Sequence, residues 1–404
     1  MRLPATPGIL FAVLLAAAAS QSRGQSSAAS LAQQRETAIA LEQQGDVASA
    51  EAAWQAILKA NPSDAEAWAN LGFLESRQQH YPEAVRYYRR ALAVGPPLPA
   101  LRMNLGLALF KAGDMKEAVG ILEPLYRSAA PDSADAQRLR LLLGMANYGA
   151  AQYPAAVNYL RDAMARDPQN LPYRLVLAHS CLWSKQYQCV LDVYHQILTL
   201  NAESAEADML AGEAYDEMRD HEDAIQQFRN AIKADPREPG VHFGLGYLLW
   251  CQSQFDEAAE EFHQEAENSP NDGQAVAYWA DAEVRLEHPD AARPLLKKAL
   301  QISSRQELPW LDLGIIDAAA GQNEAALREF RTAARLDPSD VQVHWRLARL
   351  YQATGNKAAA SAEFALTKNL NKAADESVFQ KLHAAQAGGK ANASTLSQDL
   401  SGQP

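Results

Sequence analysis

The sequence repeats itself with a period of 34 residues, and this periodicity constrains the fold more than any other feature. Counted from Leu31, ten blocks run to residue 374, with four extra residues, 133–136, between the third and fourth blocks. Such a chain folds as stacked modules, because each module needs its neighbour to bury its apolar face. We therefore expect one continuous stack rather than several globular domains. We expect a local bend at the four extra residues, because they interrupt the register.

Fixed positions within the block hold fixed types of residue. Position 8 is always glycine or alanine, position 20 is alanine except for Val190, and position 24 is always large and apolar. Small residues at positions 8 and 20 let two helices approach closely, and the large residue at position 24 fills the space beside their crossing. Glycine near position 15, as at Gly45, Gly113 and Gly355, ends the first helix. Proline at position 32 of six blocks ends the second helix. Each block is thus predicted to be a helix–turn–helix unit.

These positions resemble the tetratricopeptide repeat. The likeness is clearest in the second block, in the run Trp68-Ala69-Asn70-Leu71-Gly72 and in Ala84, Tyr88, Ala91 and Pro96. The resemblance covers residues 31–374 and implies an all-α, right-handed superhelical α-solenoid whose first helices line a concave groove. The fifth block departs from the pattern, with Val190 at position 20 and Ala202 in place of proline at position 32. The family is defined by packing residues, so the resemblance by itself indicates no activity.

The two ends of the chain lie outside the repeats. Residues 1–24 combine a basic start, an 11-residue apolar run and small residues, which is typical of a signal peptide whose cleavage site stays open. The run is too short for a transmembrane helix. An exported protein, periplasmic or extracellular, is expected, and the alternative is an apolar tail on a cytosolic protein. Residues 375–386 are predicted to form a capping helix and residues 387–404 a disordered tail.

Charge and motif content disfavour several function classes. The net charge of −12 disfavours nucleic acid, whose phosphates an acidic chain repels. Nucleotide-binding, zinc-protease, serine-hydrolase and CxxC motifs are all missing from the sequence, so we expect neither an enzyme nor a cofactor. His179 and Cys181 would project from different sides of one helix, so they are not expected to form a metal site with Cys189 and His195.

Two cysteines are predicted to face each other across the turn of the fifth helix pair. Cys181 and Cys189 occupy positions 11 and 19 of their block. In an oxidising compartment this placement allows a disulfide. The alternative is that both are small, buried apolar side chains.

The groove positions of the first helices supply the candidate peptide-binding residues. Asn70 and Asn104 occupy position 6 of consecutive blocks, where an amide can pair with a peptide backbone or is merely tolerated. In blocks 4 to 8 the groove positions include Met145, Tyr148, Leu182, Trp183, Met209, Phe243, Tyr247, Trp250 and Tyr278. Apolar side chains there indicate a contact surface, unless packing between neighbouring repeats accounts for them.

Charged residues accompany this apolar surface. Glu213, Asp216 and Glu217 lie within it and favour a ligand with an apolar face and a basic group, whereas Arg346 and Arg349 give the last block the opposite charge. We therefore predict a non-catalytic scaffold that binds a peptide or helix of a partner protein in its groove, in cell-envelope assembly or export. The alternative is a saccharide-binding or polysaccharide-export solenoid, whose groove aromatics would stack on sugar rings.

Overall fold

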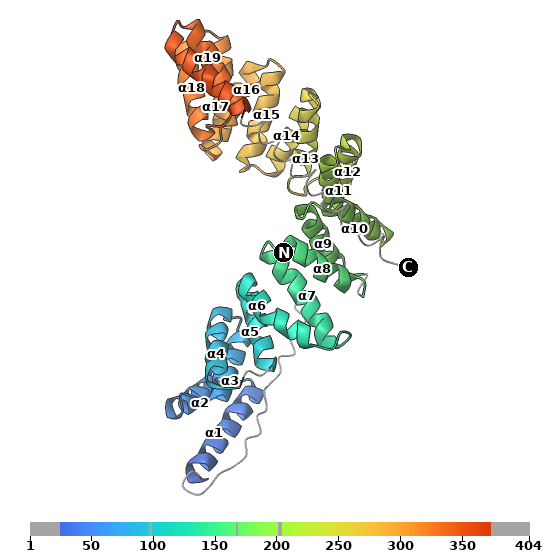
Figure 1. The fold of residues 1–404 in the computed structure, drawn as a ribbon, viewed down its shortest axis with the longest axis vertical. Helices are drawn as coiled ribbons and strands as arrows, with labels where there is room; N and C mark the ends of the chain where they lie inside the picture. The colour runs from blue at the N-terminus through green and yellow to red at the C-terminus, as the bar shows by residue number, and fades with distance from the viewer. Residues whose placement is uncertain (1–24, 97–98, 167–168, 201–203, 373–404) are drawn as a thin grey trace, which may run out of the picture. The chain divides into compact units, whose positions relative to one another are not determined.

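The computed structural model describes residues 25–96, 99–166, 169–200 and 204–372. Within these ranges every regular element is an α-helix, as Figure 1 shows, so the predicted all-α class is confirmed. The chain divides into two compact units, one up to residue 203 and the other from residue 204. The boundary between the two units falls at the end of the fifth block, the one that departs from the repeat pattern.

The first unit contains five pairs of antiparallel helices joined by short turns. The first helices of the pairs are α1 (Gln25–Gln44), α3 (Ala65–Arg77), α5 (Pro99–Ala112), α7 (Ala134–Gly149) and α9 (Leu171–Trp183). The second helices are α2 (Val47–Ala60), α4 (Tyr81–Val94), α6 (Met115–Ser128), α8 (Tyr153–Met164) and α10 (Tyr187–Thr199). The extra residues 133–136 lengthen α7 at its start, where the Ser133 hydroxyl accepts a hydrogen bond from the Ala136 backbone N–H and caps the helix. The insertion therefore adds most of a helical turn to α7.

The second unit repeats this arrangement. Its first helices are α11 (Ala205–Glu217), α13 (Val241–Cys251), α15 (Gly273–Arg285), α17 (Leu308–Ala319) and α19 (Val341–Ala353), and its second helices are α12 (His221–Ala234), α14 (Phe255–Asn268), α16 (Pro289–Ile302) and α18 (Asn323–Leu336). Residues 357–372 are helical and follow α19. Among the described residues, no helix has the length and apolarity needed to cross a bilayer. The predicted signal peptide, capping helix and tail lie outside the described residues.

Close packing between positions 8 and 24 holds each helix pair together, as the sequence predicts. A Cβ added to Gly72 would lie 2.8 Å from the ring of Tyr88, and one added to Gly106 would lie 2.4 Å from the side chain of Leu122. Because both distances are shorter than carbon atoms allow, the two helices can pack this closely only without that side chain. Ala84, at position 20, is completely buried in the same contact region.

The turn between the two helices of a pair has the same conformation in all ten blocks. The residue at position 15 has a positive φ each time: Gly45, Gln79, Gly113, Ala151, Lys185, Arg219, Ser253, Glu287, Gly321 and Gly355. This left-handed conformation is favourable for glycine and costs other residues free energy. The turn geometry is therefore imposed by the packing of the two helices, even where the sequence offers no glycine.

At three junctions in the described part of the chain, the proline at position 32 also links neighbouring repeats. Its carbonyl oxygen accepts a hydrogen bond from the ring at position 4 of the next block. The Trp68 Nε1 donates to Pro62 over 2.9 Å, and the His242 Nε2 donates to Pro236 over 3.1 Å. Proline thus ends the second helix, as predicted, and also accepts an inter-repeat hydrogen bond.

Candidate binding surfaces

In the first unit, four ring-bearing side chains from α7, α8 and α9 lie together. We call them the α9 aromatic cluster: Tyr148, Tyr153, His179 and Trp183. The Trp183 ring lies parallel to Tyr148, with 5.8 Å between centroids, and meets Tyr153 edge-on at 4.7 Å. Trp183 is 51% exposed although its ring is held by these neighbours. Two of the predicted groove residues, Tyr148 and Trp183, therefore come together in one partly exposed aromatic surface.

The second unit carries a separate group on α13 and α15, the α13–α15 aromatic cluster: Phe243, Tyr247, Trp250 and Tyr278. Tyr247 lies nearly parallel to both Phe243 and Trp250, at centroid distances of 6.4 and 6.1 Å. Tyr278 meets these three rings edge-on, at 5.5 to 5.9 Å. Tyr247 is 39% exposed and the other three are half-buried. The structure thus brings together all four aromatic residues predicted for this part of the groove.

Polar partners fix one edge of the α13–α15 aromatic cluster. The Trp250 Nε1 donates a hydrogen bond to Asp281 over 2.5 Å, and the Arg285 guanidinium lies 5.3 Å from the Trp250 ring centroid. Arg285 also pairs with Asp281, at 3.4 Å. Trp250 is therefore largely engaged in packing between repeats, which leaves Tyr247 as the ring most accessible to a ligand.

Three of the predicted acidic residues lie on α11, the first helix of the preceding repeat. Glu213 and Glu217 are exposed, and Asp216 accepts a hydrogen bond from the His221 ring over 2.9 Å. Burial, followed by the neighbouring Cys251 and Asp216, raises the pKa of Tyr247, so Asp216 lies close enough to act on the exposed ring. Of the three predicted acidic residues, Asp216 is thus the one that acts on the aromatic cluster.

Other predicted groove residues serve the core more than the surface. Leu182 is buried, and Met209 packs half-buried against the apolar contact between α11, α12 and α13. Asn104 is only 7% exposed, whereas Asn70 is half-buried on α3. The two asparagines therefore do not offer equivalent groups to a partner, because the helix packing covers the second.

In the last block, basic side chains lie beside the exposed tryptophan. Trp345 and Arg349 are exposed on α19, with the Arg349 guanidinium 5.4 Å from the Trp345 ring centroid. Arg346 is half-buried, and burial lowers its pKa.

Asp312 on α17 is 1% exposed, and neither carboxylate oxygen has a hydrogen-bond partner among the described residues. Burial, and then the nearby Asp281, raise the pKa of Asp312 well above its usual range. The sequence did not single out this buried carboxylate.

Cys181 and Cys189 form a disulfide across the α9–α10 turn, with their Cα atoms 5.8 Å apart. The Arg161 guanidinium donates to the Cys189 sulfur over 3.5 Å. Cys251 is a free, exposed cysteine in the second unit. No group of three metal-binding side chains lies together within the part of the chain that the structure describes.

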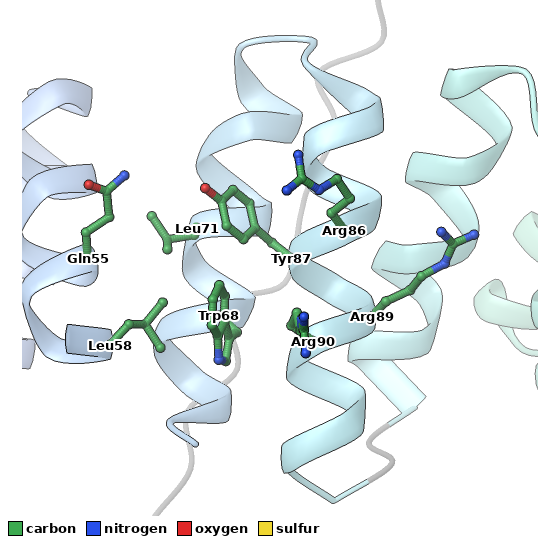
Figure 2. A pocket seen from close by; sticks show the side chains of 8 residues that line it. All are labelled: Gln55, Leu58, Trp68, Leu71, Arg86, Tyr87, Arg89 and Arg90. Atoms are coloured by element: carbon green, nitrogen blue, oxygen red, sulfur yellow. The ribbon is translucent and has the colours of Figure 1, made fainter. Parts of the chain in front are cut away.

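Sequence reasoning missed a cavity in the first unit, on α2, α3 and α4. This cavity, the arginine pocket, has a volume of about 670 Å³ and is lined by Gln55, Leu58, Trp68, Leu71, Arg86, Tyr87, Arg89 and Arg90. Figure 2 shows Gln55 and Leu58 facing the Trp68 and Tyr87 rings, with the arginines beyond them on α4. The run Arg86-Tyr87-Tyr88-Arg89-Arg90, basic in an acidic chain, is the signal that could have revealed it.

Three family models match the chain. Two are described as tetratricopeptide repeats: one matches residues 74–134 and 209–273, and the other residues 31–74. The third is described as a TPR repeat and matches residues 314–355. Together the matches cover about half of the chain and fall in both units.

Curated relatives are much longer proteins. Superkiller complex protein 3 of Mus musculus is 23% identical over 378 residues, which are 80% of this chain and 24% of that protein. The cell division cycle protein 27 homolog of Caenorhabditis elegans is 28% identical over 203 residues, which are 50% of this chain and 21% of that protein. The alignments thus span about a fifth to a quarter of these two relatives.

Solved repeat structures match parts of the chain. A tetratricopeptide repeat protein from Parabacteroides merdae aligns with a TM-score of 0.47 at 18% identity, covering 67% of this chain and 98% of that one. YrrB, described as a TPR protein with an unusual peptide-binding site, aligns with a TM-score of 0.36 at 18% identity, covering 44% and 91%.

Proposed function

Because the chain belongs to the tetratricopeptide repeat family, we propose that it is a non-catalytic scaffold that binds a segment of a partner protein. The proposed binding surface lies on the first helices of the repeats. The observation that carries the proposal is the α13–α15 aromatic cluster, in which Tyr247 stays 39% exposed among three other rings. Exposed aromatic side chains whose rings are already held lose little entropy on binding and are enriched at protein interfaces.

The charges around this cluster define the chemistry of the partner segment. Glu213 and Glu217 are exposed on α11, and Asp216 lies near Tyr247. A lysine or arginine beside an apolar side chain would meet both the carboxylates and the rings. We therefore propose an amphipathic helix or extended peptide with a basic residue next to its apolar anchor.

Export to the cell envelope forms part of the proposal. It is supported by the signal-like pattern of residues 1–24 and by the Cys181–Cys189 disulfide. Disulfides persist in oxidising compartments such as the periplasm and the extracellular space, and are rare in the cytosol. At that location, we propose a role in envelope assembly or export.

A saccharide ligand is the second candidate function. Trp183 favours it, because this indole is 51% exposed and is backed by the parallel Tyr148 ring. A flat, supported aromatic surface suits the apolar face of a sugar ring. This candidate places the ligand on the α9 aromatic cluster, so it differs from the peptide proposal in location as well as in chemistry.

Selection from a phage-displayed random peptide library, with residues 25–404 as bait, tests the peptide proposal. We expect selected peptides to combine an apolar residue with a basic one. A Tyr247→Ala variant should bind them at least about tenfold more weakly by fluorescence anisotropy. Leu336→Ala is the matched control, because Leu336 is an exposed apolar residue on a second helix, α18.

Two outcomes would oppose the peptide proposal. Equal affinity of the Tyr247→Ala and control variants would place the binding elsewhere on the chain. A glycan array on which the native chain binds, and a Trp183→Ala variant does not, would favour the saccharide function instead.

A further inference from the structure

The arginine pocket lies outside the proposed groove surface, because its charged residues belong to second helices. Arg86, Arg89 and Arg90 all project from α4, and the Trp68 and Tyr87 rings lie between them and Gln55 of α2. Its volume of about 670 Å³ lies within the range of roughly 300–1,000 Å³ that is common for ligand sites. A ligand in the arginine pocket would therefore contact residues other than those of the two aromatic clusters.

Two of the three guanidinium groups have no ion-pair partner among the described residues. Arg89 is paired with Glu117 of α6, with N–O distances of 2.5 and 2.6 Å. Arg86 and Arg90 are exposed and form no ion pair within 4.0 Å in the part of the chain that is described. In a chain of net charge −12, these two side chains form a local positive surface suited to an anion.

Three carboxylates act on Tyr87 in the pocket: Glu75 and Glu51, which have hydrogen-bond partners, and Glu83, which is exposed on α4 three residues before Arg86. Glu51 accepts a hydrogen bond from the Gln78 amide over 2.5 Å, and Glu75 accepts one from the His80 ring over 2.9 Å. Burial is the largest cause that raises the pKa of the Tyr87 phenol, and the charge of Glu75 is the second. Among the described residues, none of these carboxylates forms an ion pair with Arg86 or Arg90, so both guanidinium groups remain available to carboxylates from outside the chain.

The floor of the pocket is aromatic and held in place. The Trp68 indole is fixed by its hydrogen bond to the Pro62 carbonyl, and its ring lies 5.7 Å from that of Tyr87. Leu58 and Leu71 complete an apolar wall below the charged rim. A site that combines guanidinium groups with apolar contact area suits a ligand that has both carboxylates and an apolar side chain.

We propose that the arginine pocket binds an acidic segment of a partner protein, with an apolar side chain against Trp68 and Tyr87 and flanking carboxylates on Arg86 and Arg90. Arginine presents two parallel N–H donors to a carboxylate, which gives such pairs geometric specificity as well as charge. The chain then has a second protein-binding surface, of opposite charge preference to the α13–α15 aromatic cluster.

Fluorescence anisotropy with a fluorescein-labelled peptide, Glu-Asp-Phe-Glu-Asp, tests this proposal. The charge-reversed variant Arg86→Glu/Arg90→Glu should bind at least about tenfold more weakly than the native chain. The control variant Lys298→Glu/Arg328→Glu makes the same charge change at positions 26 and 22 of blocks 8 and 9, on exposed residues of the second unit. It should retain native affinity, and both variants should melt at the native temperature.

Two further measurements separate the effect of charge from the effects of donor geometry and apolar contact. Arg86→Lys/Arg90→Lys keeps the charge but removes the paired donors, so we expect intermediate affinity. Replacing the peptide phenylalanine by glycine should weaken binding to the native chain. Several outcomes would overturn the proposal: absence of binding at about 1 mM peptide, equal weakening in the control, or displacement by millimolar inorganic phosphate, which would assign the pocket to phosphate ligands.

Discussion

The indole Nε1 of Trp250 donates a hydrogen bond to the Asp281 carboxylate over 2.5 Å, which joins the first helices of two neighbouring repeats. Asp281 is 1% exposed, so this donor compensates a carboxylate that has little access to water. The residue that the sequence predicted as a ligand contact therefore also stabilises the stack.

Trp250→Phe should lower the free energy of unfolding by about 1–3 kcal/mol, because it leaves Asp281 with one fewer hydrogen-bond donor. Urea unfolding followed by circular dichroism measures the change. Trp183→Phe is the control, since Trp183 is half-exposed, and we expect it to change stability by less than about 0.5 kcal/mol. Equal stability of the native chain and the Trp250 variant would show that the hydrogen bond to Asp281 adds no net stability.

Asp312→Asn should stabilise the second unit at pH 8. Burial raises the pKa of Asp312, so the unfolded state ionises more readily and the native chain loses stability as the pH rises above the ordinary value of 3.8. Asparagine cannot ionise, and Asn70 and Asn104 occupy the same position in other blocks. We expect a gain of about 1–2 kcal/mol at pH 8, measured by urea unfolding.

The control for this titration is Glu260→Gln, an exposed carboxylate on α14. It should leave the pH dependence unchanged. A gain from Asp312→Asn that is as large at pH 3 as at pH 8 would contradict the ionisation argument.

His242 should make stability fall between pH 6 and pH 8. Its Nδ1 donates to Glu261 over 2.6 Å and its Nε2 to the Pro236 carbonyl, so both ring nitrogens act as donors, as the charged form requires. The hydrogen bond to Glu261 raises the pKa of His242 above 6.5. This contribution is complete below pH 6.5 and is lost as the pH rises through the raised pKa.

Thermal melting at several pH values measures this effect. His242→Gln should be less stable than the native chain at pH 6 and should show a smaller decrease towards pH 8. His288→Gln serves as the comparison, because that ring is mostly exposed. A native pH profile that is flat from 6 to 8 would disprove the prediction.

Gly106→Ala should destabilise the first unit by about 1–3 kcal/mol, since the new methyl group would lie 2.4 Å from the Leu122 side chain. Gly120→Ala provides the opposite case. A Cβ on Gly120 meets nothing within 4 Å on the exposed side of α6, so alanine should stabilise that helix by about 0.5–1 kcal/mol. Two variants with the same shift in melting temperature would refute the packing argument.

Ala151→Gly should stabilise the first unit by about 0.5–1 kcal/mol. Ala151 has φ of 58°, which glycine adopts without the steric cost that alanine carries. Gly113→Ala makes the reverse change at the same position of the preceding block, where φ is 90°, and should destabilise by about 1 kcal/mol. Calorimetric melting of both variants tests the pair, and shifts of the same sign would contradict it.

The repeated packing was predictable because it is local and the same in every block. Gly72 against Tyr88 and Gly106 against Leu122 are the same contact 34 residues apart, so a single column of the sequence describes both. Position 15 was only partly predictable. The glycines marked it in four blocks, whereas Gln79 and Ala151 adopt the same conformation with no signal in their type.

For the candidate sites, the sequence could predict which residues share a helix face. It could not predict which side chains of other helices they contact. The sequence assigned Phe243, Tyr247 and Tyr278 to one surface, and the structure places their rings in contact. It could not show that Asn104 is covered or that Trp250 is held by Asp281. Both depend on side chains of a neighbouring helix, whose identity the repeat pattern leaves free.

The sequence by itself determined the all-α class, the helix pairs and their close crossings, because those properties follow from small and large residues at fixed positions in each block. Only the tertiary structure decided which non-repeating side chains meet. The arginine pocket combines Gln55, Trp68 and Arg90 from three helices, and the buried Asp312 is acted on by Asp281 and Arg346 of the repeats on either side. The physical reason is that periodicity specifies the backbone interface, whereas a site depends on the side chains that this interface brings together.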